Sequence, residues 1–114
     1  MAILKLEKDA WGPYFDQMSK TLIGKQAEIE VASLDLGSQI EAEWVPLLGI
    51  TYDHKDDLIE ILLEDLDHLI HQPREVYIDY GVGGLISLEV IDDEDVRQII
   101  KLRDPLMLPS PATA

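Results

Sequence analysis

The strongest constraint in this sequence is a change of hydrophobic period after Gly24. Before that point apolar residues recur every three or four positions. In residues 27–33 and 38–44 they alternate with polar residues, most of them acids. A period of two is typical of strands with one buried and one solvated face. The sequence therefore predicts one helix followed by an antiparallel sheet.

An apolar stripe predicts the N-terminal helix. Its members lie at the spacing of one helix face, and they are Trp11, Tyr14, Phe15, Met18 and Leu22. We expect Asp9 to be the N-cap, Pro13 to lie in or near the first turn and Gly24 to end the helix. An aromatic stripe of this kind indicates packing on a core rather than a ligand site.

Two hairpins are predicted in the sheet. Gly37 ends a short turn between the first two alternating segments, and the acid run 92–95 separates the apolar segments 85–91 and 96–102. This run lacks the central Gly and final Glu of a calcium loop, so we interpret it as a turn. Pro46 cannot donate to a ladder and predicts a bulge or kink, with the strand resuming over residues 47–51.

Residues 58–71 are ambiguous. Leu58, Leu62, Leu66 and Leu69 have helical spacing, whereas Ile59, Ile61 and Leu63 alternate as in a strand. Periodicity alone does not decide between the two.

Composition narrows the classes of function. The chain has 114 residues, enough for one core, and a net charge of −14, of which residues 26–114 carry −15. Such a charge disfavours binding to nucleic acid and to anionic membranes, although it also serves solubility alone. There are no cysteines, no apolar run long enough to span a bilayer and no signal-peptide pattern. We expect a cytoplasmic protein without a cofactor.

Several segments together resemble a family. The sequences DAWGPYFDQMSK, VPLLGITYD, LIEILLED, DHLIHQPREV and the closing IIKLR are similar, in order and spacing, to a family of small bacterial proteins known only as a domain of unknown function. The resemblance covers about residues 7–103. It implies a helix followed by strands, which favours a strand at residues 58–63, and it includes the segment that holds His68 and His71. It implies no activity.

His68 and His71 are the candidate metal ligands. On a helix, residues three apart share a face, whereas on a strand they lie on opposite faces. A third ligand would have to come from elsewhere, with Asp65, Asp67 and His54 as candidates. If the segment is a strand, we expect His68 to be the more buried of the pair and His71 the exposed one. Hydrogen-bonded histidines without a metal are the alternative.

No catalytic motif is visible. Ser and Lys residues stand in no nucleophile motif, and the GVGG segment lacks the spacing of a phosphate-binding loop. Trp44 shares its parity with Ile40 and Ala42, which favours a place in the core over the rim of a groove. The candidate interaction surface consists of Tyr52, Tyr77 and the acid run Asp92, Asp93, Glu94 and Asp95.

Together these features predict an α+β fold. We expect an N-terminal amphipathic helix and a strongly bent antiparallel sheet or small barrel of five to seven strands, SH3-like or Sm-like. Residues 1–103 would form one domain and residues 104–114 an extended, proline-rich tail. We expect a non-enzymatic protein-interaction or regulatory module that binds a protein partner, with self-association through a sheet edge as an option. The alternative is a metal- or small-ligand-binding protein, including a hydrolase, centred on His68 and His71.

Overall fold

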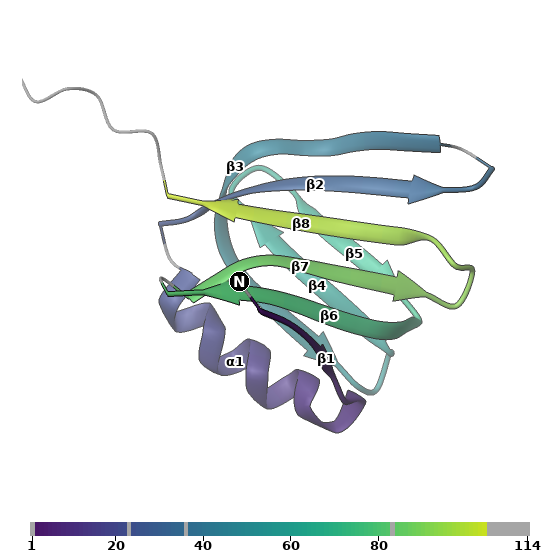
Figure 1. Cartoon of the computed structure of the whole chain (residues 1–114), viewed down its shortest axis with the longest axis horizontal. Helices are drawn as coiled ribbons and strands as arrows, with labels where there is room; N and C mark the ends of the chain where they lie inside the picture. Colours follow the sequence, from purple (N-terminus) through teal and green to yellow (C-terminus); the bar gives the residue numbers. More distant parts are fainter. Residues whose placement is uncertain (1, 23, 36, 83, 105–114) are drawn as a thin grey trace, which may run out of the picture.

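The fold is known from a computed structural model that describes residues 2–22, 24–35, 37–82 and 84–104 (Figure 1). The predicted 104–114 tail lies outside the described residues, apart from Asp104. The elements in chain order are strand β1 (Ala2–Leu6), 3-10 helix η1 (Lys8–Ala10), helix α1 (Trp11–Leu22), and strands β2 (Gln26–Ser33), β3 (Gly37–Asp53), β4 (Leu58–Leu63), β5 (Asp67–His71), β6 (Pro73–Gly81), β7 (Gly84–Asp92) and β8 (Arg97–Arg103).

The strands form one curled antiparallel sheet in the order β1-β6-β7-β8-β2-β3-β4-β5. Each neighbouring pair is antiparallel, and the chain folds into a half-barrel with one short helix. This confirms the predicted α+β class and the strong bend. The expected five to seven strands were too few, because β1 precedes the helix and the sequence pattern gave no separate signal for it. The likeness to SH3-like and Sm-like barrels stays a prediction.

Strand β3 produces the bend. Its first half pairs with β2, and its second half pairs with β4. Three extra residues interrupt these ladders: one where Glu43 and Trp44 oppose a single residue of β2, one at Glu41, and one at Leu48 opposite β4. A bulged strand bends and twists more strongly than a regular one. The irregularity predicted at Pro46 is therefore present on both sides of that residue.

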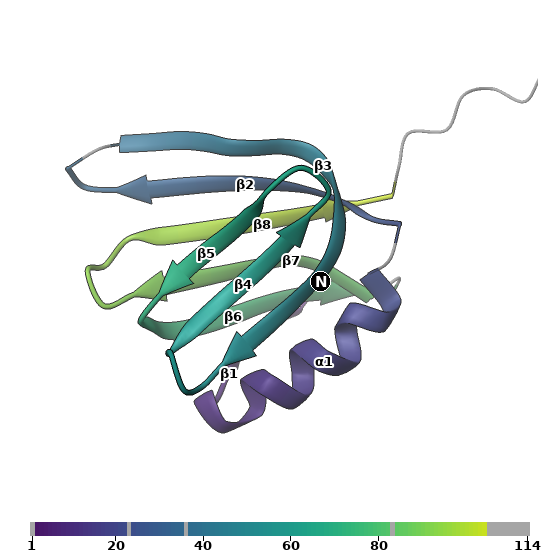
Figure 2. The same ribbon diagram turned by 180° about the vertical axis from the view of Figure 1, so that it is seen from behind.

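The bend creates two layers. Strands β4 and β5 cross in front of β6, β7 and β8 when the molecule is viewed from behind (Figure 2). The core fills the space between the layers, and its fully buried side chains include Ile29, Ile50, Ile61, Leu88 and Ile100. Residues 58–63 and 67–71 form the strands β4 and β5, so the strand alternative was right for both segments.

Helix α1 closes the open side of the half-barrel, next to the second half of β3. The Ser19 hydroxyl donates to the Ile50 carbonyl oxygen at 2.8 Å and accepts from the Ile50 N–H at 3.0 Å. Gly49 lies opposite, where an added Cβ would be 3.6 Å from the Ser19 Oγ. One serine thus satisfies both polar groups of a β3 residue that has no strand on that side.

The predicted helix is present, but its start differs. Asp9 lies inside η1 and is not an N-cap; the residue in that place is Glu7, which makes no side-chain capping bond. Trp11, Phe15 and Leu22 are buried as expected. Trp11 anchors the helix, because its Nε1 donates to the Leu6 carbonyl oxygen at 3.1 Å and its ring packs edge-on against Tyr52 at 5.1 Å.

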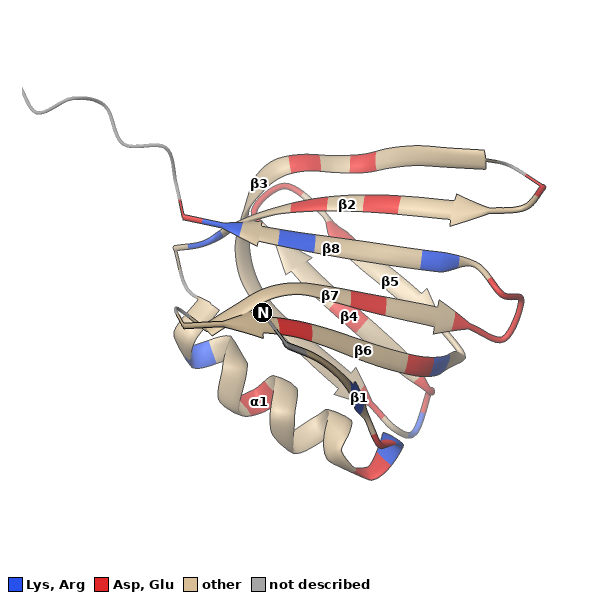
Figure 3. Cartoon of the chain, viewed as in Figure 1, with Lys and Arg blue, Asp and Glu red and all other residues tan. Residues whose placement is uncertain are grey.

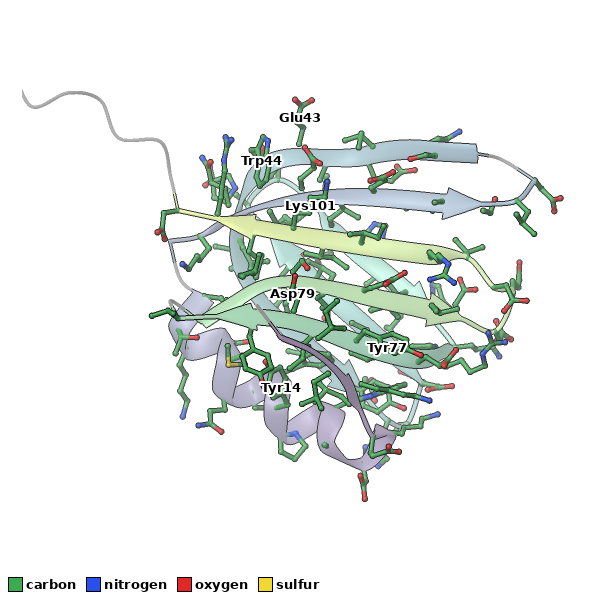
Figure 4. All side chains as sticks on the ribbon, viewed as in Figure 1. Tyr14, Glu43, Trp44, Tyr77, Asp79 and Lys101 are labelled. Carbon is green, nitrogen blue, oxygen red and sulfur yellow. The ribbon has the colours of Figure 1, made fainter. Side chains whose placement is uncertain are left out.

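Trp44 is not a core residue, contrary to our prediction from parity. Its φ is +52°, and it belongs to the bulge at Glu43, which breaks the alternation. The side chain projects outward beside the end of β8 (Figure 4). There the Arg103 guanidinium carbon lies 4.0 Å from its ring centroid. Ile40 is likewise 52% exposed, and of this predicted inward set only Ala42 is buried.

The two tryptophans give a matched stability test. We expect Trp11→Ala to lower the free energy of unfolding by about 3–5 kcal/mol, because it empties a buried site and removes the hydrogen bond to the Leu6 carbonyl. Trp44→Ala should cost only about 1 kcal/mol, the scale of an exposed cation–π contact. Urea unfolding followed by circular dichroism measures both. Equal losses would contradict the assignment of Trp11 as the anchor.

Candidate interaction surfaces

An apolar hollow lies along the seam between α1 and the sheet. We call it the helix–sheet groove, and it has a volume of about 320 Å³. Its lining is almost wholly apolar and consists of Leu4, Tyr14, Met18, Ile78, Tyr80, Gly84 and Leu85. These residues come from β1, α1, β6 and β7, so the groove lies between α1 and this part of the sheet.

The groove has a buried floor and an exposed rim. Ile78 and Leu85 are 3% and 7% exposed, whereas Leu4 and Tyr80 are 48% and 41% exposed. Tyr14 rises from α1 toward the sheet (Figure 4). Burial of its phenol, followed by the proximity of Tyr80, raises the pKa of Tyr14. An apolar surface of this kind is suited to apolar side chains rather than to charged ligands.

Strand β1 is one edge of the sheet and pairs only with β6 among the described strands. Ile3 on its outer side is 76% exposed and lies opposite Asp79. Apolar, exposed edge strands favour the pairing of a further strand. Lys5, which forms an ion pair with Glu75 at 3.4 Å, is the only charged residue of this strand.

The outer face beside β1 is acidic and contains a buried carboxylate oxygen without a partner among the described residues. Asp79 Oδ1 is buried and has no hydrogen-bond partner among the described residues. It borders a small hollow of about 90 Å³ that Ile3, Ser87 and Glu89 also line. Since an unpaired buried acceptor costs about 1–3 kcal/mol, a donor brought by another molecule would be bound favourably there. The acids and the few cations of this face are shown in Figure 3.

Tyr77, a predicted interaction residue, lies on this same outer face. Its hydroxyl donates to Glu75 Oε1 at 2.9 Å. This bond raises the pKa of the phenol and, together with the nearby Lys5 and Arg74, lowers the pKa of Glu75. Glu75 therefore already has its partners, unlike Asp79.

Tyr52 does not join this surface. It lies on the second half of β3, where it packs against Trp11, and its hydroxyl donates to Asp57 Oδ1 at 2.7 Å. Desolvation of the phenol, and then the bond to Asp57, raise its pKa to about 12. The sequence could not separate this half-buried tyrosine from Tyr77, because both have polar neighbours in the chain.

The acid run forms the predicted turn between β7 and β8. Asp92 Oδ1 accepts the backbone N–H groups of Glu94 and Val96, at 2.9 and 3.0 Å. Asp95 pairs with Arg74, and Asp93 and Glu94 are exposed.

A hollow of about 410 Å³ lies between this turn and the tip of the β2–β3 hairpin, lined partly by Leu34 and Asp35. It is an acidic surface with one fully exposed apolar side chain, Leu34.

His68 and His71 lie on opposite faces of β5. His68 is half-buried and its Nε2 forms a hydrogen bond with Gln98 Oε1 of β8, the buried polar residue of the described core. His71 is exposed at the strand end. The relative burial of the pair is as predicted for a strand.

The candidate third ligands His54, Asp65 and Asp67 are exposed. In residues 2–104, where described, no group of three or more His, Asp or Glu side chains could hold a metal ion. Metal binding by the pair stays a prediction.

The helix–sheet groove escaped sequence analysis. Tyr14 and Met18 were recognised as part of the helix stripe, but their neighbours Leu4, Tyr80 and Leu85 are far away in the chain. The only local signal was the apolar segment AIL at the start of the sequence, which is not part of the apolar stripe of the helix.

No helix in the described ranges is long and apolar enough to cross a membrane.

The bond between His68 and Gln98 joins the two layers and can be tested. We expect Gln98→Ala to lower the free energy of unfolding by about 1–3 kcal/mol, because the half-buried imidazole loses its partner. A double-mutant cycle with His68→Ala, measured by urea unfolding, tests the bond. The loss of free energy of unfolding in the double variant should be smaller than the sum of the losses in the two single variants. Strictly additive losses would show that the bond does not form in solution.

The pKa of Tyr52 predicts a loss of stability at high pH. An unfolded tyrosine ionises at its ordinary pKa of 10.0, whereas Tyr52 in the fold ionises at about 12. The folded state therefore holds more protons between these values, so stability falls as pH rises from 10 towards 12. Urea unfolding across this range should show that Tyr52→Phe flattens the decline. An unchanged slope in Tyr52→Phe would contradict this assignment.

Comparison with known proteins supports the resemblance seen in the sequence. An uncharacterised protein of Aquifex aeolicus (strain VF5) is 39% identical over 110 residues, which cover 96% of this chain and 99% of that protein. No solved structure matches the chain significantly. The model of a family of unknown function, DUF5335, matches residues 2–111. The chain therefore belongs to the family DUF5335.

Proposed function

We propose that this protein is a non-enzymatic protein-interaction module that binds an extended, basic segment of a partner as an additional strand along β1. The observation that carries the proposal is the apolar edge of β1, which among the described strands pairs with β6 alone, beside the unpaired Oδ1 of Asp79. An added strand would continue the ladder and cover Ile3. A Lys or Arg on it could reach over Ile3 to Asp79.

The other edge of the sheet supports this choice of β1. Strand β5 is short and presents Asp67, Leu69 and His71 as exposed side chains. Of these, Asp67 and His71 are charged or polar, and such residues protect an edge against pairing. Strand β1 has only Lys5 for this purpose, and Lys5 is engaged with Glu75.

The overall charge supports a basic partner. The net charge of −14 raises the rate at which a cationic segment finds this protein and repels nucleic acid. On this proposal the interaction weakens at high salt, because part of it is ionic. His68 and His71 do not favour a second function, since they share no face.

Matched lysine substitutions test the proposal. Ile3→Lys should abolish partner capture, because it adds charge to the edge and supplies in cis the cation that Asp79 lacks. Leu34→Lys makes the same change at the exposed β2–β3 hairpin tip and should leave capture intact. The measurement is affinity capture from a lysate of the source organism, at low and high salt, quantified by mass spectrometry. Loss of the captured protein with Leu34→Lys and not with Ile3→Lys would overturn the proposal and place binding at the hairpin tips.

A further inference from the structure

The helix–sheet groove is an unfilled seam in the fold. On its other side α1 is fixed to β3 by the two Ser19 hydrogen bonds, but toward the sheet the helix leaves a hollow of about 320 Å³. A cavity of roughly 150 Å³ holds a molecule as large as benzene, so this hollow has room for more than one aliphatic side chain. With Leu4 and Tyr80 nearly half exposed at its rim, the groove gains stability from any apolar group that covers it.

The described chain ends at Asp104, directly after β8. The ladder between β7 and β8 reaches Ser87 and Lys101, and Gly84, which lines the groove, and Asp104 each lie three residues beyond that pair in the chain. Asp104 also forms an ion pair with Lys25 at 2.8 Å.

Lys25 connects the end of the described chain at Asp104 to the end of helix α1. Its backbone N–H donates to the carbonyl oxygen of Leu22, the last residue of α1, at 3.0 Å. Met18, which lines the groove, lies one helical turn before Leu22. Through Lys25, the end of the described chain therefore lies near the end of α1, the helix that contributes Met18 to the groove. In Figures 1 and 2 the end of β8, the end of α1 and the start of β7 all lie on the same side of the molecule.

The residues that follow Asp104 have the composition to fill the groove. Residues 105–109 are Pro-Leu-Met-Leu-Pro, and the whole segment 105–114 contains no charged residue, although 28% of the chain is charged. Each proline fixes its own φ and favours an extended conformation in the residue before it. Four extended residues span up to about 14 Å, the width of about three strands.

We propose that Leu106, Met107 and Leu108 dock in the helix–sheet groove of their own chain, with Met107 near Met18. A tether this short gives the segment an effective concentration in the millimolar range, so the chain's own groove is favoured over that of a second copy. The docked segment would cover the rim at Tyr80 and complete the seam that α1 leaves open. The proposal concerns the groove and stands whether or not β1 recruits a partner strand.

Because the chain contains no cysteine, disulfide trapping tests this directly. One variant carries Met18→Cys and Met107→Cys, and its control carries Gln17→Cys and Met107→Cys. Gln17 is the exposed neighbour of Met18 and does not line the groove. A disulfide requires Cα atoms within about 7 Å. We expect an intramolecular disulfide to form at least roughly tenfold faster in the first variant, because docking raises the local concentration of the two thiols.

The full-length variants are oxidised at low protein concentration and followed by non-reducing electrophoresis and mass spectrometry. Circular dichroism of the reduced proteins confirms that both pairs fold, and only folded pairs are compared. If Met18→Cys disturbs the helix, Tyr80→Cys with Met107→Cys replaces it, since Tyr80 also lines the groove and is partly exposed. Equal rates for the groove and control pairs, or no trapping in either, would overturn the proposal. Disulfides formed mainly between molecules would overturn it as well and assign the groove to the tail of a second copy.

Discussion

The bend in β3 is the constraint on which the rest of the structure depends. A single strand of 17 residues belongs to both layers, with β2 as the partner of its first half and β4 as the partner of its second. If its bulges were removed, the second half would continue the first layer, and Ile50 and Ile61 would lose the facing sheet that buries them. The bulge also turns Trp44 outward, where it stacks with Arg103 instead of entering the core.

Folding one sheet over itself leaves an open side, and α1 closes it unevenly. Toward β3 the helix acts in place of a strand, because Ser19 satisfies the backbone of Ile50 and Gly49 allows close approach. Toward β1 and β6 the helix is held at its start, where Trp11 bonds to Leu6 of β1, whereas beside Tyr14 and Met18 the groove remains.

The sequence was sufficient for local features and insufficient for those that depend on the bend. The period change at Gly24, the hairpin turn at Gly37 and the turn at Asp92 were all predictable, because each follows from neighbours in the chain. The position of Trp44 was not, because one extra residue in a strand reverses the parity of every side chain beyond it. Strand β1 was missed because five residues before a helix carry too short a pattern. The groove was unpredictable for a further reason: its walls come from four elements that only the fold brings together.

The two sheet edges differ in a way that the fold alone does not require. Strand β5 is tied to the opposite layer through His68 and Gln98, and its outward positions are mainly polar. Strand β1 is equally short, yet Ile3 and Leu4 are exposed on its two faces, and Asp79 beside it has an unpaired buried oxygen. Exposed apolar edges and unsatisfied carboxylates both lower stability and solubility. Their occurrence on the same edge, and not on the guarded one, is more consistent with a surface kept for binding than with imperfect packing distributed at random.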